Sequence, residues 1–152
     1  MRKFIIAGNW KMHLTQGEAK ALIAQLRPSA DAAPIDVVVC PAFTALAAAA
    51  AALQGSTIGL GAQDLFWEPQ GAFTGEVSAS MLADAGCRYV LIGHSERRTS
   101  FGETDQTIAK KLAAALTAHL IPIVCIGETL QERDAHHTWT TLTRQLEGGL
   151  HG

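Results

Sequence analysis

In one stretch of the sequence, a histidine, a carboxylate and two arginines follow directly after an apolar run. Residues 88–98 read Arg-Tyr-Val-Leu-Ile-Gly-His-Ser-Glu-Arg-Arg. Residues 89–92 do not alternate with polar ones, which is typical of a strand buried on both faces. We expect Ser95 to cap a helical turn whose free N–H groups point back toward His94. The imidazole would then lie at the carboxyl end of a parallel strand, where α/β proteins place their chemistry, unless it only bonds a loop.

The composition of the 152-residue chain favours one globular segment, residues 1–152, without an internal domain boundary. Hydrophobic residues make up 48% and charged residues 17%, which is too apolar for a disordered chain. A net charge of −2 gives no electrostatic reason to expect nucleic acid or an anionic membrane as a partner. No apolar run approaches a membrane span, and the run after Lys3 is too short for the core of a signal peptide.

The three cysteines, Cys40, Cys87 and Cys125, are an odd number and lack metal-type spacing. We interpret them as small buried hydrophobic residues of a protein in a reducing compartment. A cytoplasmic location and no metal site are therefore expected.

Apolar runs and helical patterns alternate five times along the chain. The expected strands are 3–8, 36–40, 57–62, 89–92 and 120–126. A first helix should open at Thr15, where Glu18 completes a capping box, and end at Pro28. The other helices are expected at about 43–53, at 78–85, after a second capping box at Ser100 and Glu103, and from about 130 to 148 with Trp139, Leu142 and Leu146 on one stripe.

Strict alternation of strands and helices with short connections predicts a parallel sheet with right-handed crossovers. Two architectures fit five such units: an open doubly wound sheet, or the first five units of a (β/α)₈ barrel. Periodicity alone does not separate them. The long loop 63–77 is of a length that is usually functional or covered by a partner.

Six motifs follow one another over the whole chain. They are Gly-Asn-Trp-Lys-Met at 8–12, Gly-Ala-Gln-Asp at 61–64, Gly-Ala-Phe-Thr-Gly-Glu-Val-Ser at 71–78, Gly-His-Ser-Glu-Arg-Arg at 93–98, Phe-Gly-Glu-Thr-Asp at 101–105 and Cys-Ile-Gly-Glu-Thr-Leu at 125–130. In this order and spacing the sequence resembles the triosephosphate isomerase family. The resemblance implies a TIM barrel, here its first five βα units, usually assembled as a homodimer. It also implies interconversion of dihydroxyacetone phosphate and glyceraldehyde 3-phosphate through an enediol(ate), without a cofactor.

The resemblance also assigns the catalytic roles. His94 is the electrophile that polarises the substrate carbonyl, and Lys11 binds the substrate and offsets developing negative charge. Asn9 donates a hydrogen bond to the substrate nearby, and Glu96 is the ion-pair partner of Lys11. Without the flanking motif, Lys11 would be interpreted as a solvated loop lysine.

Other residues have supporting roles by the same resemblance. Cys125 is a packing residue behind the site, and Ser95 supports His94 through the cap that its own sequence predicts. The loop that starts at Gln63 and carries Thr74 inserts into a second subunit. A self-contained Ω-loop of a monomer is the alternative for this segment.

Part of the family's chemistry has no residue in this sequence. The general base follows the sixth strand beneath a mobile lid, and the phosphate loops follow strands six to eight. No residue of this chain takes the base role, since Glu128 belongs to a different motif. We therefore expect the chain to be inactive alone and to need a C-terminal half-barrel, in the same or another polypeptide. A non-catalytic open-sheet binding or scaffolding module is the alternative.

Overall fold

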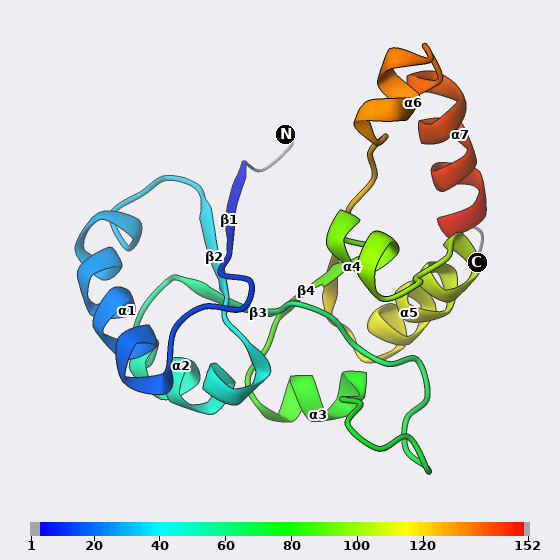
Figure 1. Cartoon of the computed structure of the whole chain (residues 1–152). Helices are drawn as coiled ribbons and strands as arrows, with labels where there is room; N and C mark the ends of the chain where they lie inside the picture. Colours follow the sequence, from blue (N-terminus) through cyan, green and yellow to red (C-terminus); the bar gives the residue numbers. More distant parts are fainter. Residues whose placement is uncertain (1–3, 151–152) are drawn as a thin grey trace.

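Five parallel strands form one curled sheet, and helices connect each strand to the next (Figure 1). The computed structural model describes residues 4–150, so Lys3, the first residue of the expected first strand, lies outside the described residues. The strands are β1 (Ile5–Asn9), β2 (Asp36–Cys40), β3 (Gly59–Ala62), β4 (Tyr89–Ile92) and β5 (Ile121–Val124).

Seven α-helices and one short 3₁₀ helix are found within residues 4–150. They are α1 (Gln16–Ala30), η1 (Phe43–Ala45), α2 (Leu46–Ala52), α3 (Ala79–Asp84), α4 (Ser95–Ser100), α5 (Asp105–Thr117), α6 (Leu130–Asp134) and α7 (Thr138–Gly149). None of the helices in this part of the chain has the length and apolar character needed to cross a bilayer.

The order of the strands decides between the two architectures. Each strand pairs in parallel with its neighbour in sequence, giving the order β1-β2-β3-β4-β5. A doubly wound sheet would break this order at the point where the chain reverses direction. Continuous order is the arrangement in a (β/α)₈ barrel, and the curled sheet is the half-barrel that the sequence predicts.

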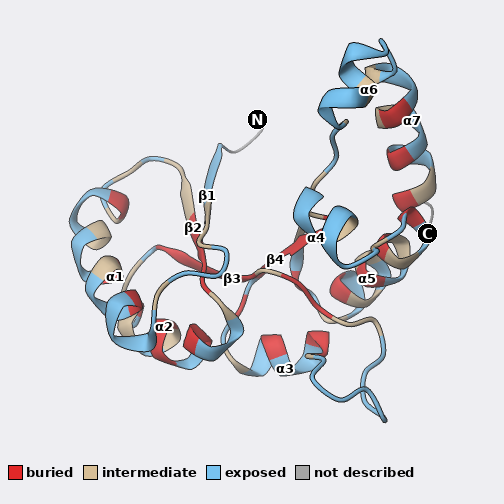
Figure 2. Cartoon of the chain, in the orientation of Figure 1, coloured by how far each residue is buried: buried red, intermediate tan, exposed pale blue. Residues whose placement is uncertain are grey.

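The two faces of the sheet pack differently. The face toward the helices builds the larger core, in which Val39, Leu60 and Val90 meet helix residues such as Ile23 and Ile108. The opposite face carries a smaller cluster made only of strand residues: Val38, Cys40, Tyr89, Leu91 and Ile123. Buried residues therefore gather on the central strands, whereas β1 is exposed, with Phe4, directly before it, 79% exposed (Figure 2).

The first helix ends later than predicted, for a reason of tertiary structure. The first helix continues through Pro28 to Ala30. Contacts with other elements stabilise its last turn: Ala30 is buried, and Arg27 donates a hydrogen bond to the carbonyl of Ala52 at the end of α2. At the other end of the helix the predicted capping box is confirmed, since the backbone N–H of Thr15 donates to the Glu18 carboxylate at 2.7 Å.

The second predicted capping box, at Ser100 and Glu103, does not form. Ser100 ends α4, and α5 instead begins after Thr104, whose hydroxyl accepts the N–H of Thr107. The carboxylate of Glu103 instead forms ion pairs with Arg97 and Lys111, which compete with local capping.

The last predicted helix is two helices, and its apolar stripe does not face the core. Trp139 is 79% exposed, and the buried residues of α7 are Thr141, Gln145 and Gly149. This face packs against α5, because Gly148 and Gly149 allow close approach to Asp105 and Ile108. Gln145 also bonds both backbone groups of Gly127, in the loop after β5. Polar contacts therefore orient α7.

We expect Gly59→Ala to destabilise the chain. An added Cβ would lie 2.6 Å from Cε2 of Tyr89, so the aromatic ring would have to move within a packed cluster. A loss of about 1–3 kcal/mol in the free energy of unfolding by urea is expected. Gly17→Ala is the matched control: nothing lies within 4 Å of its added Cβ in α1, so about 0.5–1 kcal/mol should be gained. Equal effects of the two changes would contradict the packing of Gly59 against Tyr89.

Because two thiols are buried, we expect the free energy of unfolding to fall at alkaline pH. Burial raises the pKa of both Cys40 and Cys87 to about 12. An unfolded cysteine ionises near pH ~8.5, so above this pH the unfolded chain binds fewer protons than the folded one. Stability is then complete below about pH 8.5 and falls by up to about 1.4 kcal/mol per thiol and pH unit above it. Urea unfolding at several pH values between neutrality and mild alkalinity measures this slope, and Cys40→Ala combined with Cys87→Ala should flatten it.

Candidate active site

Lys11 lies just beyond the end of β1, in a backbone conformation that is uncommon for lysine. Its φ angle is +53°, and the side-chain oxygen of Asn9 accepts its N–H at 3.0 Å. The amide of Gln63, after β3, donates to the carbonyls of Lys11 at 2.9 Å and of Cys40 at 2.8 Å. These hydrogen bonds connect the ends of β1, β2 and β3. Gln63 was predicted only as the start of a dimer loop, but it contacts Lys11 within its own chain.

His94 occupies the N-cap position of α4, the place that the sequence assigns to Ser95. Its own Nδ1 accepts the N–H of Glu96 at 3.3 Å, and Ser95 is instead the first residue of the helix. The ring takes this role because Gly93, with φ of +73°, turns the chain sharply out of β4. Because Nδ1 accepts this hydrogen bond, the ring N–H lies on Nε2. No residue in the range 4–150 bonds Nε2, so this N–H can donate to a substrate.

An ion pair connects the first and fourth strand ends across 85 positions of sequence. Lys11 Nζ lies 2.7 Å from Oε1 of Glu96, and about half of each side chain is exposed. The hydrogen bond from Lys11 lowers the pKa of Glu96. Glu96 therefore stays ionised and holds the ammonium group beside His94.

These side chains surround a small cavity of about 190 Å³. It is lined by Asn9, Lys11, Met12, Gln63, His94, Glu96, Arg97 and Phe101. The volume fits a molecule of a few heavy atoms, and the polar part of the lining consists of two cations, two amides, one imidazole and one carboxylate. This arrangement suits stabilisation of an anionic oxygen.

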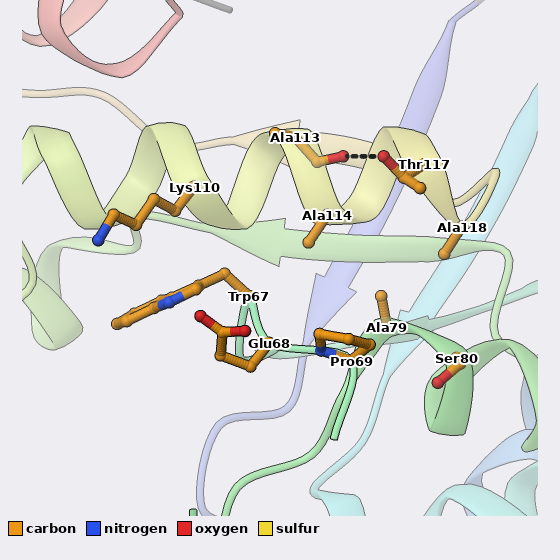
Figure 3. A pocket seen from close by; sticks show the side chains of 10 residues that line it. All are labelled: Trp67, Glu68, Pro69, Ala79, Ser80, Lys110, Ala113, Ala114, Thr117 and Ala118. Carbon is orange, nitrogen blue, oxygen red and sulfur yellow. Dashed lines mark hydrogen bonds between the residues drawn. The ribbon is translucent and has the colours of Figure 1, made fainter. Parts of the chain in front are cut away.

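A larger hollow of about 570 Å³ lies on the outer side, between α3, α5 and the loop after β3 (Figure 3). Four alanines line much of it, and the Lys110 ammonium lies 5.2 Å from the centre of the Trp67 ring. No histidine or cysteine lines this hollow, so its size alone does not make it the site of chemistry.

Behind the small cavity lies a largely buried ion network, and Arg97 and Glu103 have in it the structural role that their sequence favours over a catalytic one. Arg97 contacts Asp64 at 2.9 Å and Glu103 at 2.5 Å, and Lys111 pairs with the same two carboxylates. Burial raises the pKa of Asp64, whereas hydrogen bonds from Lys111 and Arg97 lower that of Glu103 against the effect of burial. One sequence signal was available: Lys111 follows Ile108 by three residues, on the core face of α5.

Two other predicted residues stand apart from the cavity lining. Cys125 is half-buried after β5, and burial raises the pKa of its thiol, which suits packing and not nucleophilic attack. Thr74 is exposed in the loop 63–77 and does not line the cavity. Within residues 4–150 no group of three histidine, cysteine or acidic side chains is arranged to hold a metal ion.

Comparison with known proteins gives one consistent result. The family model for triosephosphate isomerase matches residues 4–152. The triosephosphate isomerases of Moorella thermoacetica and Citrifermentans bemidjiense are 61% and 57% identical over the whole chain. The crystal structure of the Bartonella henselae triosephosphate isomerase superposes with a TM-score of 0.93 at 40% identity, covering 99% of this chain and 62% of that one. The chain spans 61% of the length of the two curated relatives.

We expect Lys111→Met to be strongly destabilising, because it leaves Asp64 and Glu103 buried with one cation fewer. Breaking a buried pair in this way costs about 3–5 kcal/mol, measurable by urea unfolding. Lys110→Met is the matched control on the same helix. Lys110 only faces the Trp67 ring, and its loss should cost at most about 1 kcal/mol. Similar losses in the two variants would show that the network does not stabilise the fold.

Proposed function

The chain belongs to the triosephosphate isomerase family, and on this premise we propose that it supplies the electrophilic half of a site that interconverts dihydroxyacetone phosphate and glyceraldehyde 3-phosphate. The observation that carries the proposal is the convergence of Lys11, His94 and Glu96 on one small cavity from separate strand ends. The proposal concerns the activity of the complete site, since the chain covers 61% of its curated relatives' length.

The reaction moves a carbonyl between adjacent carbons through an enediol(ate), so negative charge develops on the carbonyl oxygen. The Nε2–H of His94 donates to that oxygen, and the ammonium of Lys11 offsets the charge. Because the oxygen of Asn9 already accepts the N–H of Lys11, its NH₂ group is the part of the amide that faces the substrate. Glu96 does not transfer a proton; it keeps Lys11 in place.

The carbon-bound proton needs a base that residues 4–150 do not provide. Glu128 follows β5, but hydrogen bonds from its own backbone N–H and from Arg133 lower its pKa and make it a weak base. We propose that the base, the lid and the phosphate loops come from the portion of the relatives' length that this chain does not cover. A non-catalytic binding module would have no use for the Lys11–Glu96 pair beside His94.

A homodimer formed through the loop 63–77 is part of the proposal. The loop is exposed from residue 68 to residue 76, including Thr74, and the Phe66 ring contacts the tilted rings of Trp67 and Phe73. This internal packing presents the exposed tip in a defined shape for a second subunit. A cytoplasmic location is proposed as well, because all three cysteines are free.

We expect His94→Gln to reduce turnover by roughly 10²–10³-fold with a smaller change in KM, because it replaces the imidazole N–H donor to the developing oxyanion with a less acidic amide N–H. The variant is made in a fusion of this chain to the C-terminal segment of the Moorella thermoacetica relative, assayed with glyceraldehyde 3-phosphate. His137→Gln, an exposed histidine remote from the cavity, is the control and should leave turnover unchanged.

Two outcomes would contradict the proposal in different ways. Isomerisation at an enzymic rate by the unfused chain would show that it contains its own base. A folded fusion without activity would remove the isomerase function itself.

A further inference from the structure

Asp105 is a buried carboxylate shared by two arginines from different helices. It is the first residue of α5 and is 8% exposed. One oxygen accepts from Nη1 of Arg98 on α4, and the other accepts from Nη1 of Arg144 on α7, each at 2.6 Å. Gly148 of α7 packs so closely that an added Cβ would lie 2.8 Å from that of Asp105. The carboxylate therefore has a fixed position between three helices.

Arg98 extends this contact to the backbone that precedes His94. Its Nε donates to the carbonyl of Gly93 at 2.9 Å, while Nη2 lies 3.5 Å from the carbonyl of Cys125. Gly93 is buried and has a φ of +73°, and an added Cβ would lie 2.8 Å from Ile108. Only glycine fits at position 93. Gly93 therefore has no side chain whose packing could fix the peptide that follows it. Within residues 4–150 the guanidinium is the one side-chain donor to this carbonyl.

The peptide that joins Gly93 to His94 is planar, so fixing its carbonyl also fixes the direction in which the chain enters His94. Both contacts given for the imidazole within residues 4–150 involve Glu96 and are long: Nδ1 accepts the backbone N–H at 3.3 Å and lies 3.5 Å from a carboxylate oxygen. Its placement thus depends on the backbone beneath it.

We propose that Asp105 is a positioning residue for the electrophile: through Arg98 it orients the Gly93–His94 peptide and thereby aims the imidazole of His94 into the cavity. The inference rests on the proposed function for the role of His94 in turnover. The orientation itself is a property of this chain and is measurable without substrate.

The first test compares Asp105→Asn with Arg144→Gln in the full chain, labelled with ¹⁵N and ¹³C. Asp105→Asn keeps the shape of the side chain but removes the charge that holds Arg98. We expect shifted backbone resonances at Gly93 and His94 and exchange of the Glu96 amide hydrogen at least about 10-fold faster, by local opening. Arg144→Gln removes the cation on the other oxygen, from a side chain that is 57% exposed, and should leave all three sites unchanged.

Arg98→Lys keeps a cation for Asp105 but loses the fork that reaches the Gly93 carbonyl, and it should reproduce the local changes of Asp105→Asn. This variant also tests the link if Asp105→Asn fails to fold. In the fusion described above, both variants should lower kcat by roughly 10–100-fold while KM changes by less than about 3-fold, as for a misplaced catalytic group.

Unchanged Gly93, His94 and Glu96 signals in folded Asp105→Asn and Arg98→Lys would overturn the proposal. Equal local changes in Arg144→Gln would overturn it too, because they would trace the effect to the docking of α7. An inactive fusion with the expected spectral changes would contradict only the proposed function.

Discussion

The carboxyl ends of neighbouring parallel strands lie along one edge of a sheet, and this constraint assembles the site. β1, β3 and β4 each deliver one polar residue just past their last paired position: Lys11, Gln63 and His94. These residues are far apart in sequence, yet strand pairing alone brings their backbones together. The side chains then adjust locally, through the amide of Gln63 and the ion pair of Lys11 with Glu96.

Two kinds of ion pair surround the site and have different effects. The Lys11–Glu96 pair is half exposed, so water screens it and it contributes little to stability. The pairs of Arg97 and Lys111 with Asp64 and Glu103 are largely withdrawn from water, and removing one member leaves uncompensated charge. Breaking the pairs behind the cavity therefore costs more stability than breaking the pair at its edge.

Sequence patterns predicted the features that depend on a residue's own segment. The strand Tyr89–Ile92 and the cap at Thr15 are local, and both form as expected. The predictions that fail involve residues whose stronger partners are remote in sequence. Glu103 matches a capping box, but Lys111 and Arg97 bind its carboxylate.

The same reason explains the errors in and near the site. His94 replaces Ser95 as the cap because the turn at Gly93 brings its ring to the Glu96 amide. The apolar stripe of α7 faces outward because Arg144 and Gln145 dock the opposite side. Periodicity identifies an amphipathic helix, but not which of its faces has the better partner.

Gly59 and Gly61 give β3 no side chain on the face of the sheet away from the helices, where Tyr89 and Cys40 fill the space. Positions 59 and 89 thus share a single volume between adjacent strands. A larger side chain at one of these positions requires a smaller one at the other. Positions 59 and 89 should therefore covary among related sequences, even though neither residue lines the cavity.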